Sequence, residues 1–272
     1  METIADQTPS PLTAQAAIAR LRRDLAIGAA LKVTLAVALI IALSSRHDAV
    51  RTGAFFAIGA AWVAMTLGSR RGTALAAGSS SLIAAGLHDA AEAQLSQALR
   101  GFSLFRSSKL LGIHHLALLR HTQRRWDESA ALSRALLRLR LGPLKSLGRS
   151  ARLMLASASV NTGDLPTAYV AIVQLYGERL SLGESLHLLR TQTEYEARVG
   201  AWPSMMQNLP VKAQLAELMP APDAATVQAL WGLAARKTGR PDWEQWLCAR
   251  AALLGDVQEL TTRQPMLREL WA

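Results

Sequence analysis

The amino-acid sequence predicts an all-α protein, in which two N-terminal transmembrane helices precede an α–α superhelix of about five helical hairpins. Three observations support this prediction. Aromatic residues make up only 5% of the 272 residues, and Ala and Leu, which favour helices, dominate the apolar residues. Two long apolar runs lie near the N-terminus. Turn signals then divide the remaining chain at nearly even intervals.

The first part of the chain is predicted to form a transmembrane hairpin. A polar tail and a short amphipathic helix fill residues 1–24, and the hairpin fills residues 25–71. Its first apolar run, residues 26–45, is interrupted only by Lys32 and would span about 30 Å as a helix. The second run, residues 52–69, contains no charged residue and would span roughly 27 Å. The alternative is a pair of buried helices in a soluble domain.

Basic residues around the two runs predict the orientation of the hairpin. The flanking residues are Arg20, Arg22, Arg23, Lys32, Arg70 and Arg71, and those in the loop between the runs are Arg46 and Arg51. The positive-inside rule places the side with more basic residues in the cytoplasm. We therefore expect a protein of the inner or plasma membrane of a bacterial-type cell. Both ends of the chain, and the whole region after Arg71, are predicted to be cytoplasmic.

Residues 72–272 are predicted to form a helical-repeat domain with a C-terminal capping helix. Five turns divide this region, and their first residues are 38, 39, 37 and 39 positions apart. Regular spacing in this range is typical of helical solenoids. We expect Pro210 to split one helix and Asp256 to begin the last one. The first residues of the five turns are Gly86, Arg124, Gly163, Gly200 and Gly239.

The central turn shows a resemblance to a known repeat family. Leu155-Ala156, Ser159, Gly163-Asp164 and Ala168 resemble a tetratricopeptide repeat (TPR). That family has a Leu–small pair in its first helix, a Gly-Asp-type turn and an early Ala in its second helix. The resemblance covers residues 73–253, with a period about four residues longer than usual for the family. It implies a concave groove, lined by the first helices, that binds protein partners.

The resemblance also places candidate residues in this groove. His114 and His121 lie two helical turns apart, about 10 Å, which is too far for them to share one metal ion. We therefore predict no metal site and no cofactor. The candidate groove residues are His114, His115, Leu118 and His121 in one repeat, and His187, Arg190, Glu194 and Arg198 in the next repeat but one.

The positive charge of the chain is concentrated in residues 100–152. This segment carries 12 basic and 2 acidic side chains, a surplus equal to the net charge of +10 of the whole chain. Three interpretations stay open: a solvated face, contact with anionic lipid headgroups, or contact with nucleic acid, which is least favoured because interleaved aromatic residues are missing. The candidate residues for contact with an anionic surface are Arg120, Arg124, Arg134 and Arg138.

No catalytic pattern accompanies these features. The sequence contains no Gly-rich phosphate loop, no His-Glu-x-x-His motif and no nucleophile elbow, and Cys248 is its only cysteine. Trp243 and Trp246, like the other tryptophans near the turns, are assigned to packing between repeats. We therefore predict a non-enzymatic, membrane-anchored scaffold or adaptor that binds protein partners. The alternatives are an envelope-assembly factor with its solenoid outside the membrane, and a protein whose basic segment binds anionic lipid or nucleic acid.

Overall fold

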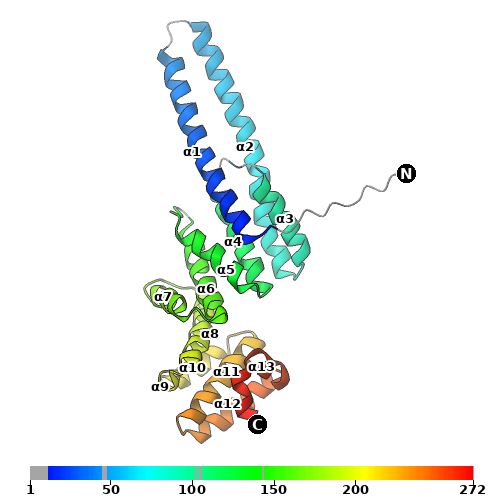
Figure 1. Cartoon of the computed structure of the whole chain (residues 1–272), viewed down its shortest axis with the longest axis vertical. Coiled ribbons are helices and arrows are strands. Elements are labelled where there is room, and N and C mark those ends of the chain that lie inside the picture. Colours follow the sequence, from blue (N-terminus) through cyan, green and yellow to red (C-terminus); the bar gives the residue numbers. More distant parts are fainter. Residues whose placement is uncertain (1–11, 45–47, 102, 104–105, 143, 272) are drawn as a thin grey trace, which may run out of the picture. The chain divides into compact units, whose positions relative to one another are not determined.

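The described part of the chain is helical, as predicted. The structure is a computed structural model that describes residues 12–44, 48–101, 103, 106–142 and 144–271 (Figure 1). No strand occurs within these ranges. The chain divides into two compact units that meet after Met154, within helix α6 (Lys145–Thr162). Each unit is described by itself below.

Unit 1, which ends at Met154, begins with two long helices that run side by side, α1 (Ala14–Ser44) and α2 (Asp48–Ala84) (Figure 1). α1 contains 31 residues without a break. The predicted short helix and the first apolar run therefore form one helix, because no proline or turn residue separates them. α2 contains 37 residues and continues beyond the second apolar run into the repeat region. The predicted tail 1–11 and the loop residue Arg46 lie outside the described residues.

Three more helices and the first part of α6 complete unit 1. They are α3 (His88–Arg100), α4 (Arg106–Thr122) and α5 (Trp126–Leu137). α2 packs against α3 and α4, and α1 also contacts α4 and α5. Leucine and isoleucine side chains from α3 and α4 fill the core between these helices, among them Leu95 and Ile113, which are fully buried. The first turns of α1 and the last turns of α2 are therefore an integral part of this core.

The five predicted turns share one backbone conformation. The first residue of each has a positive φ, between 59° and 82°, in the left-handed region. At Gly86, the backbone N–H donates to the carbonyl of Ile83 at 3.0 Å, and the next N–H donates to the carbonyl five residues earlier at 2.9 Å. This Schellman motif satisfies the last carbonyls of a helix. The predicted turn positions are confirmed, and the same pair of bonds recurs at Arg124, Gly200 and Gly239.

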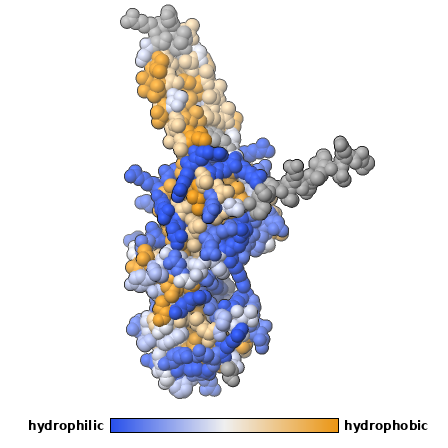
Figure 2. All heavy atoms as spheres, viewed as in Figure 1, coloured by the Kyte–Doolittle hydropathy of each residue, from blue (hydrophilic) through white to orange (hydrophobic). Residues whose placement is uncertain are grey.

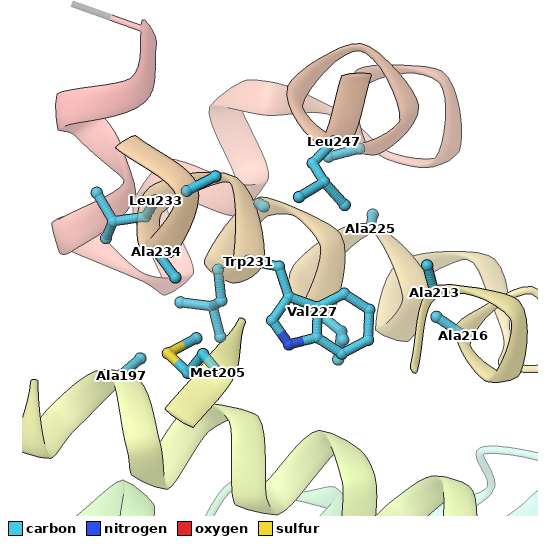
Figure 3. Close-up of a cluster of buried hydrophobic side chains, with 14 of the residues drawn as sticks. Ala197, Met205, Ala213, Ala216, Ala225, Val227, Trp231, Leu233, Ala234 and Leu247 are labelled. Carbon is cyan, nitrogen blue, oxygen red and sulfur yellow. The ribbon is translucent and has the colours of Figure 1, made fainter. Parts of the chain in front are cut away.

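Unit 2, from Leu155 onward, is built around helix α11 (Ala221–Lys237), which packs against α8 (Leu182–Val199) and α12 (Pro241–Leu254). Trp231 of α11 is 0% exposed and shares a cluster with Met205, Ala213 and Val227 (Figure 3). The other elements of this unit are α7 (Leu165–Tyr176), α9 (Trp202–Met205), α10 (Leu209–Ala216), α13 (Val257–Arg263), η1 (Pro265–Leu267) and α14 (Arg268–Trp271).

Two helix boundaries of unit 2 follow the sequence predictions. Pro210 lies in the first turn of α10, which is separated from α9 by Asn208 with φ 52°. The Asp256 carboxylate accepts a hydrogen bond from the backbone N–H of Gln258 at 2.8 Å, and α13 begins one residue after Asp256. Leu267 of the following turn is buried against the α11 core. The C-terminal segment therefore covers part of this core.

Candidate functional site

The apolar part of the hairpin lies on the surface of the structure. Two described helices are long and apolar enough to cross a membrane, over Ala14–Ser44 and Thr52–Ala84, yet only 11% and 6% of their most apolar windows are buried. Core helices of a soluble protein would be mostly buried. The exposed large side chains, of which Phe56 is 71% exposed, are Ile27, Val33, Val37, Ile40, Ile41, Leu43, Phe55, Phe56, Trp62, Val63 and Leu67.

Basic side chains lie at the base of this apolar surface. We define the base by Gly28 of α1 and Ser69 of α2, which are buried where the hairpin joins the rest of unit 1. Figure 2 shows hydrophilic residues directly adjoining the hydrophobic hairpin. Positive charge at the end of an apolar helix pair suits the boundary between a bilayer and water. The exposed residues of this basic collar are Arg22, Arg23, Lys32, Arg70, Arg71 and Arg106.

Arg120 is not part of an exposed basic surface, contrary to the sequence prediction. Its side chain is 0% exposed and forms two bonds with the Glu92 carboxylate, of 2.6 and 2.8 Å. Its Nε lies 2.9 Å from Glu128, and its Nη2 donates to the backbone carbonyl of Leu12 at 3.1 Å. The hydrogen bond from Arg120 lowers the pKa of Glu92, so this pair is charged at neutral pH. Arg120 therefore ties α3, α4, α5 and the start of the described chain together.

The other three candidates for an anionic surface gather around α5. Arg124 is exposed in the turn before this helix, Arg134 is half-buried within it, and Arg138 is exposed directly after it. Arg134 makes interactions within the chain. Arg124 and Arg138 therefore remain the accessible members of the predicted set.

His114 and His115 are core residues of unit 1 and do not face an open groove. Both are buried, since α2 covers this face of α4. The Nδ1 of His115 donates to the backbone carbonyl of Ala76 at 2.7 Å and lies 3.0 Å from the Ser79 hydroxyl. Burial, with a smaller contribution from His115, lowers the pKa of His114 to about 4, so His114 is neutral at pH 7. His121, on the same helix, packs edge-to-face on Trp126 at 4.9 Å.

The candidate residues of α8 are brought together in unit 2, where α11 contacts them. Arg190 bonds the buried Glu194 at 3.0 Å and also pairs with Asp223 in the first turn of α11. Burial, and secondly the charge of Arg190, lower the pKa of His187 to about 4. Arg198 is exposed at the end of α8. Apart from Arg198, these residues serve the contact between α8 and α11.

An apolar groove, which we call the tryptophan groove, lies between α10 and α12 and was not predicted from the sequence. It has a volume of about 480 Å³ and is lined by Pro210, Ala213, Glu217, Trp243 and Trp246, among others. The two indole rings meet edge-to-face at 5.7 Å, and Trp246 is 44% exposed. Trp243 and Trp246 are three residues apart, a spacing that places both rings on one face of a helix. This spacing was visible in the sequence, but both tryptophans were assigned to packing between repeats. Packing accounts for Trp231 but not for the exposed ring of Trp246.

Comparison with known protein families, curated proteins and solved structures gives no match. The function is therefore inferred from the residues of this chain alone. Within the described ranges, no three His, Cys, Asp or Glu side chains lie close enough together to hold a metal ion. The features that remain for function are the exposed hairpin, the basic collar and the tryptophan groove.

Proposed function

We propose that this protein is a membrane-anchored, TPR-like scaffold: the α1–α2 hairpin crosses the bilayer, and the helical repeats bind protein partners. The exposed hairpin is the observation that carries this proposal. Burying one large apolar side chain contributes about 1.5–3 kcal/mol. The eleven exposed side chains between residues 27 and 67 are 45–71% exposed, so burying their exposed parts would together favour insertion by roughly 10–20 kcal/mol.

A bilayer fits this surface better than a partner helix does. An amphipathic helix that docks on another protein has one apolar face, whereas a transmembrane helix is apolar on all sides. Ile40 and Ile41 are adjacent in α1 and therefore point about 100° apart, yet each is more than 60% exposed. Phe55 and Phe56 of α2 show the same arrangement. The exposed apolar residues of each helix therefore extend beyond one narrow stripe, and the second run, residues 52–69, contains no charged residue.

The basic collar supports a cytoplasmic location for the repeats. It lies at the end of the hairpin that continues into α3 and α4, and positive residues are retained on the cytoplasmic side of inner membranes. The alternative is an envelope-assembly factor whose repeats lie on the outer side. A C-terminal fusion to green fluorescent protein or to alkaline phosphatase separates the two, because each reporter is active on one side only.

The repeats support the scaffold role through their turns and through the tryptophan groove. Five turns with a left-handed first residue, four of them with the Schellman pair of bonds, recur at a period near 38 residues, which is typical of stacked helical hairpins. The tryptophan groove offers partners two aromatic rings beside the carboxylates of Asp242 and Glu217, of which Glu217 pairs with Arg250. The occupant that suits this groove is an apolar peptide segment carrying a basic residue, since aromatic faces and carboxylates both attract cations.

The anchor is tested by extraction of membranes with alkaline carbonate. The wild-type protein is expected to remain in the membrane pellet. The double variant Ile40→Asp/Phe56→Asp places two carboxylates in the spans, at a cost of about 5–7 kcal/mol, and is expected to leave a larger fraction in the supernatant than the wild type. The control is Val211→Asp/Leu253→Asp, at exposed positions of unit 2, which is expected to stay in the pellet. Wild-type protein in the supernatant would refute the anchor.

The scaffold role is tested by affinity capture from detergent-solubilised membranes. Trp246→Ala is expected to lower the recovery of at least one partner about fivefold or more, because truncation of an aromatic anchor costs more than about 1 kcal/mol. Leu253→Ala is the matched control, since Leu253 is 79% exposed on the same helix but does not line the tryptophan groove. Identical sets of partners for wild type and Trp246→Ala would argue against binding in this groove.

A further inference from the structure

Two adjoining cavities lie beside α1 at the base of the hairpin. The first has a volume of about 210 Å³, and its lining includes Asp24, Lys32, Arg106 and Lys109. The second, of about 380 Å³, is again lined by Lys32 and Arg106 and adds Arg140. Because the two cavities share these side chains, we treat them together as the α1 hollow. All of its lining residues belong to unit 1.

The acidic side chain of the α1 hollow is already neutralised. The Lys109 ammonium lies 2.8 Å from the Asp24 carboxylate and also donates to backbone carbonyls, and both side chains are buried. Lys32, Arg106 and Arg140 are exposed, and none of them forms an ion pair with another described residue. Three positive charges around the hollow are therefore available to an anion.

Apart from Ser103 and Ser107, the remaining walls of the α1 hollow are formed by apolar residues and glycines. Leu25 and Ala29 of α1 line the first cavity, and Leu141 and Leu144 line the second. Directly beyond Lys32, Val33 is 63% exposed at the start of the outer part of α1. The hollow thus lies where the apolar surface of the hairpin gives way to charged residues. A ligand that matches these walls has an anionic head and an apolar body.

We propose that the α1 hollow binds one anionic phospholipid, with its phosphate between Lys32, Arg106 and Arg140 and its glycerol and upper acyl carbons against the leucines. This inference rests on the proposed insertion of the hairpin, which brings the hollow to the depth of the headgroups. Long Lys and Arg side chains reach phosphates from such positions. The site differs from the predicted contact through the arginines around α5, because it is a defined hollow rather than an exposed face.

The test measures the phospholipid retained by the full-length protein purified in detergent. Native mass spectrometry is performed after incubation with phosphatidylglycerol, phosphatidylcholine or inorganic phosphate. The triple variant Lys32→Gln/Arg106→Gln/Arg140→Gln removes the proposed phosphate contacts. Arg124→Gln/Arg138→Gln/Arg198→Gln is the control, because it removes three exposed charges outside the hollow. Circular dichroism confirms that both variants are folded.

Wild-type protein is expected to retain one phosphatidylglycerol per chain and to prefer it over phosphatidylcholine. The triple variant is expected to bind phosphatidylglycerol about 10- to 100-fold more weakly, since each basic residue near a headgroup contributes to the attraction. The control variant is expected to bind like the wild type. Equal binding by the triple variant would overturn the proposal, as would equal losses in both variants or complete displacement of the lipid by inorganic phosphate. Failure of the anchor is recognised separately, by wild-type protein in the carbonate supernatant.

Discussion

Replacement of Arg120 by methionine is expected to destabilise unit 1 by about 3–5 kcal/mol. Methionine fills much of the space of the arginine stem but leaves the Glu92 carboxylate without its guanidinium, whereas Glu128 keeps its pair with Arg125. Breaking a buried ion pair by removing one partner is costly because the remaining charge stays in a poorly solvated place. The measurement is urea unfolding of the full-length protein in detergent, followed by hydrogen exchange of α3–α5.

Two further variants show whether charge is the cause. Arg124→Met, at an exposed position in the next turn, is expected to change the stability by less than about 1 kcal/mol. Adding Glu92→Gln and Glu128→Gln to Arg120→Met removes both carboxylate charges that faced the guanidinium and is expected to restore part of the loss. A triple variant as unstable as Arg120→Met alone would mean that packing, and not charge, explains the effect.

Trp231→Ala is expected to destabilise unit 2 by a similar amount, about 3–5 kcal/mol. Trp231 is the largest fully buried side chain among the described residues, and its removal leaves a cavity among Met205, Ala213 and Val227 (Figure 3). The indole N–H has no hydrogen-bond partner among the described residues. Trp231→Phe, which loses only part of the volume, is therefore expected to cost clearly less than the alanine variant.

The measurement is thermal unfolding of the full-length protein, with hydrogen exchange of α11 reporting on unit 2. Trp246→Ala provides the comparison on the neighbouring helix, because its ring is half exposed. It is expected to cost less than about 1 kcal/mol. Equal losses for Trp231→Ala and Trp246→Ala would show that burial does not set the contribution of these tryptophans.

The turns were predictable from the sequence because their causes are local. A residue in the left-handed conformation closes a helix because its N–H bonds the carbonyl three residues earlier and the next N–H bonds the carbonyl five residues before itself, and glycine adopts that conformation at no steric cost. Even Arg124 was placed correctly, since the spacing between Gly86 and Gly163 located the turn. The two apolar helices were also predictable from local sequence, because the length and the lack of charge of each run do not depend on distant residues.

The candidate site residues were harder to predict because burial depends on distant parts of the chain. Arg120 is buried through Glu92, 28 residues earlier, and Leu12, 108 residues earlier. His115 is covered by Ala76 and Ser79, which lie on α2, the helix that continues from the second apolar run into this core. The tryptophan groove likewise depends on α10, which exists as a separate helix only because the chain breaks before Pro210.

The continuity of α2 has a mechanical consequence. One helix of 37 residues begins in the apolar hairpin and ends in the core with α3 and α4, so no flexible linker separates the two. An uninterrupted helix resists bending over this length, and sharp kinks need a proline or a similar interruption. In a membrane, the part of unit 1 formed by α3, α4 and α5 would therefore stand at a fixed height and tilt above the lipid surface. A thicker or thinner bilayer that tilts the hairpin would turn this part by the same angle.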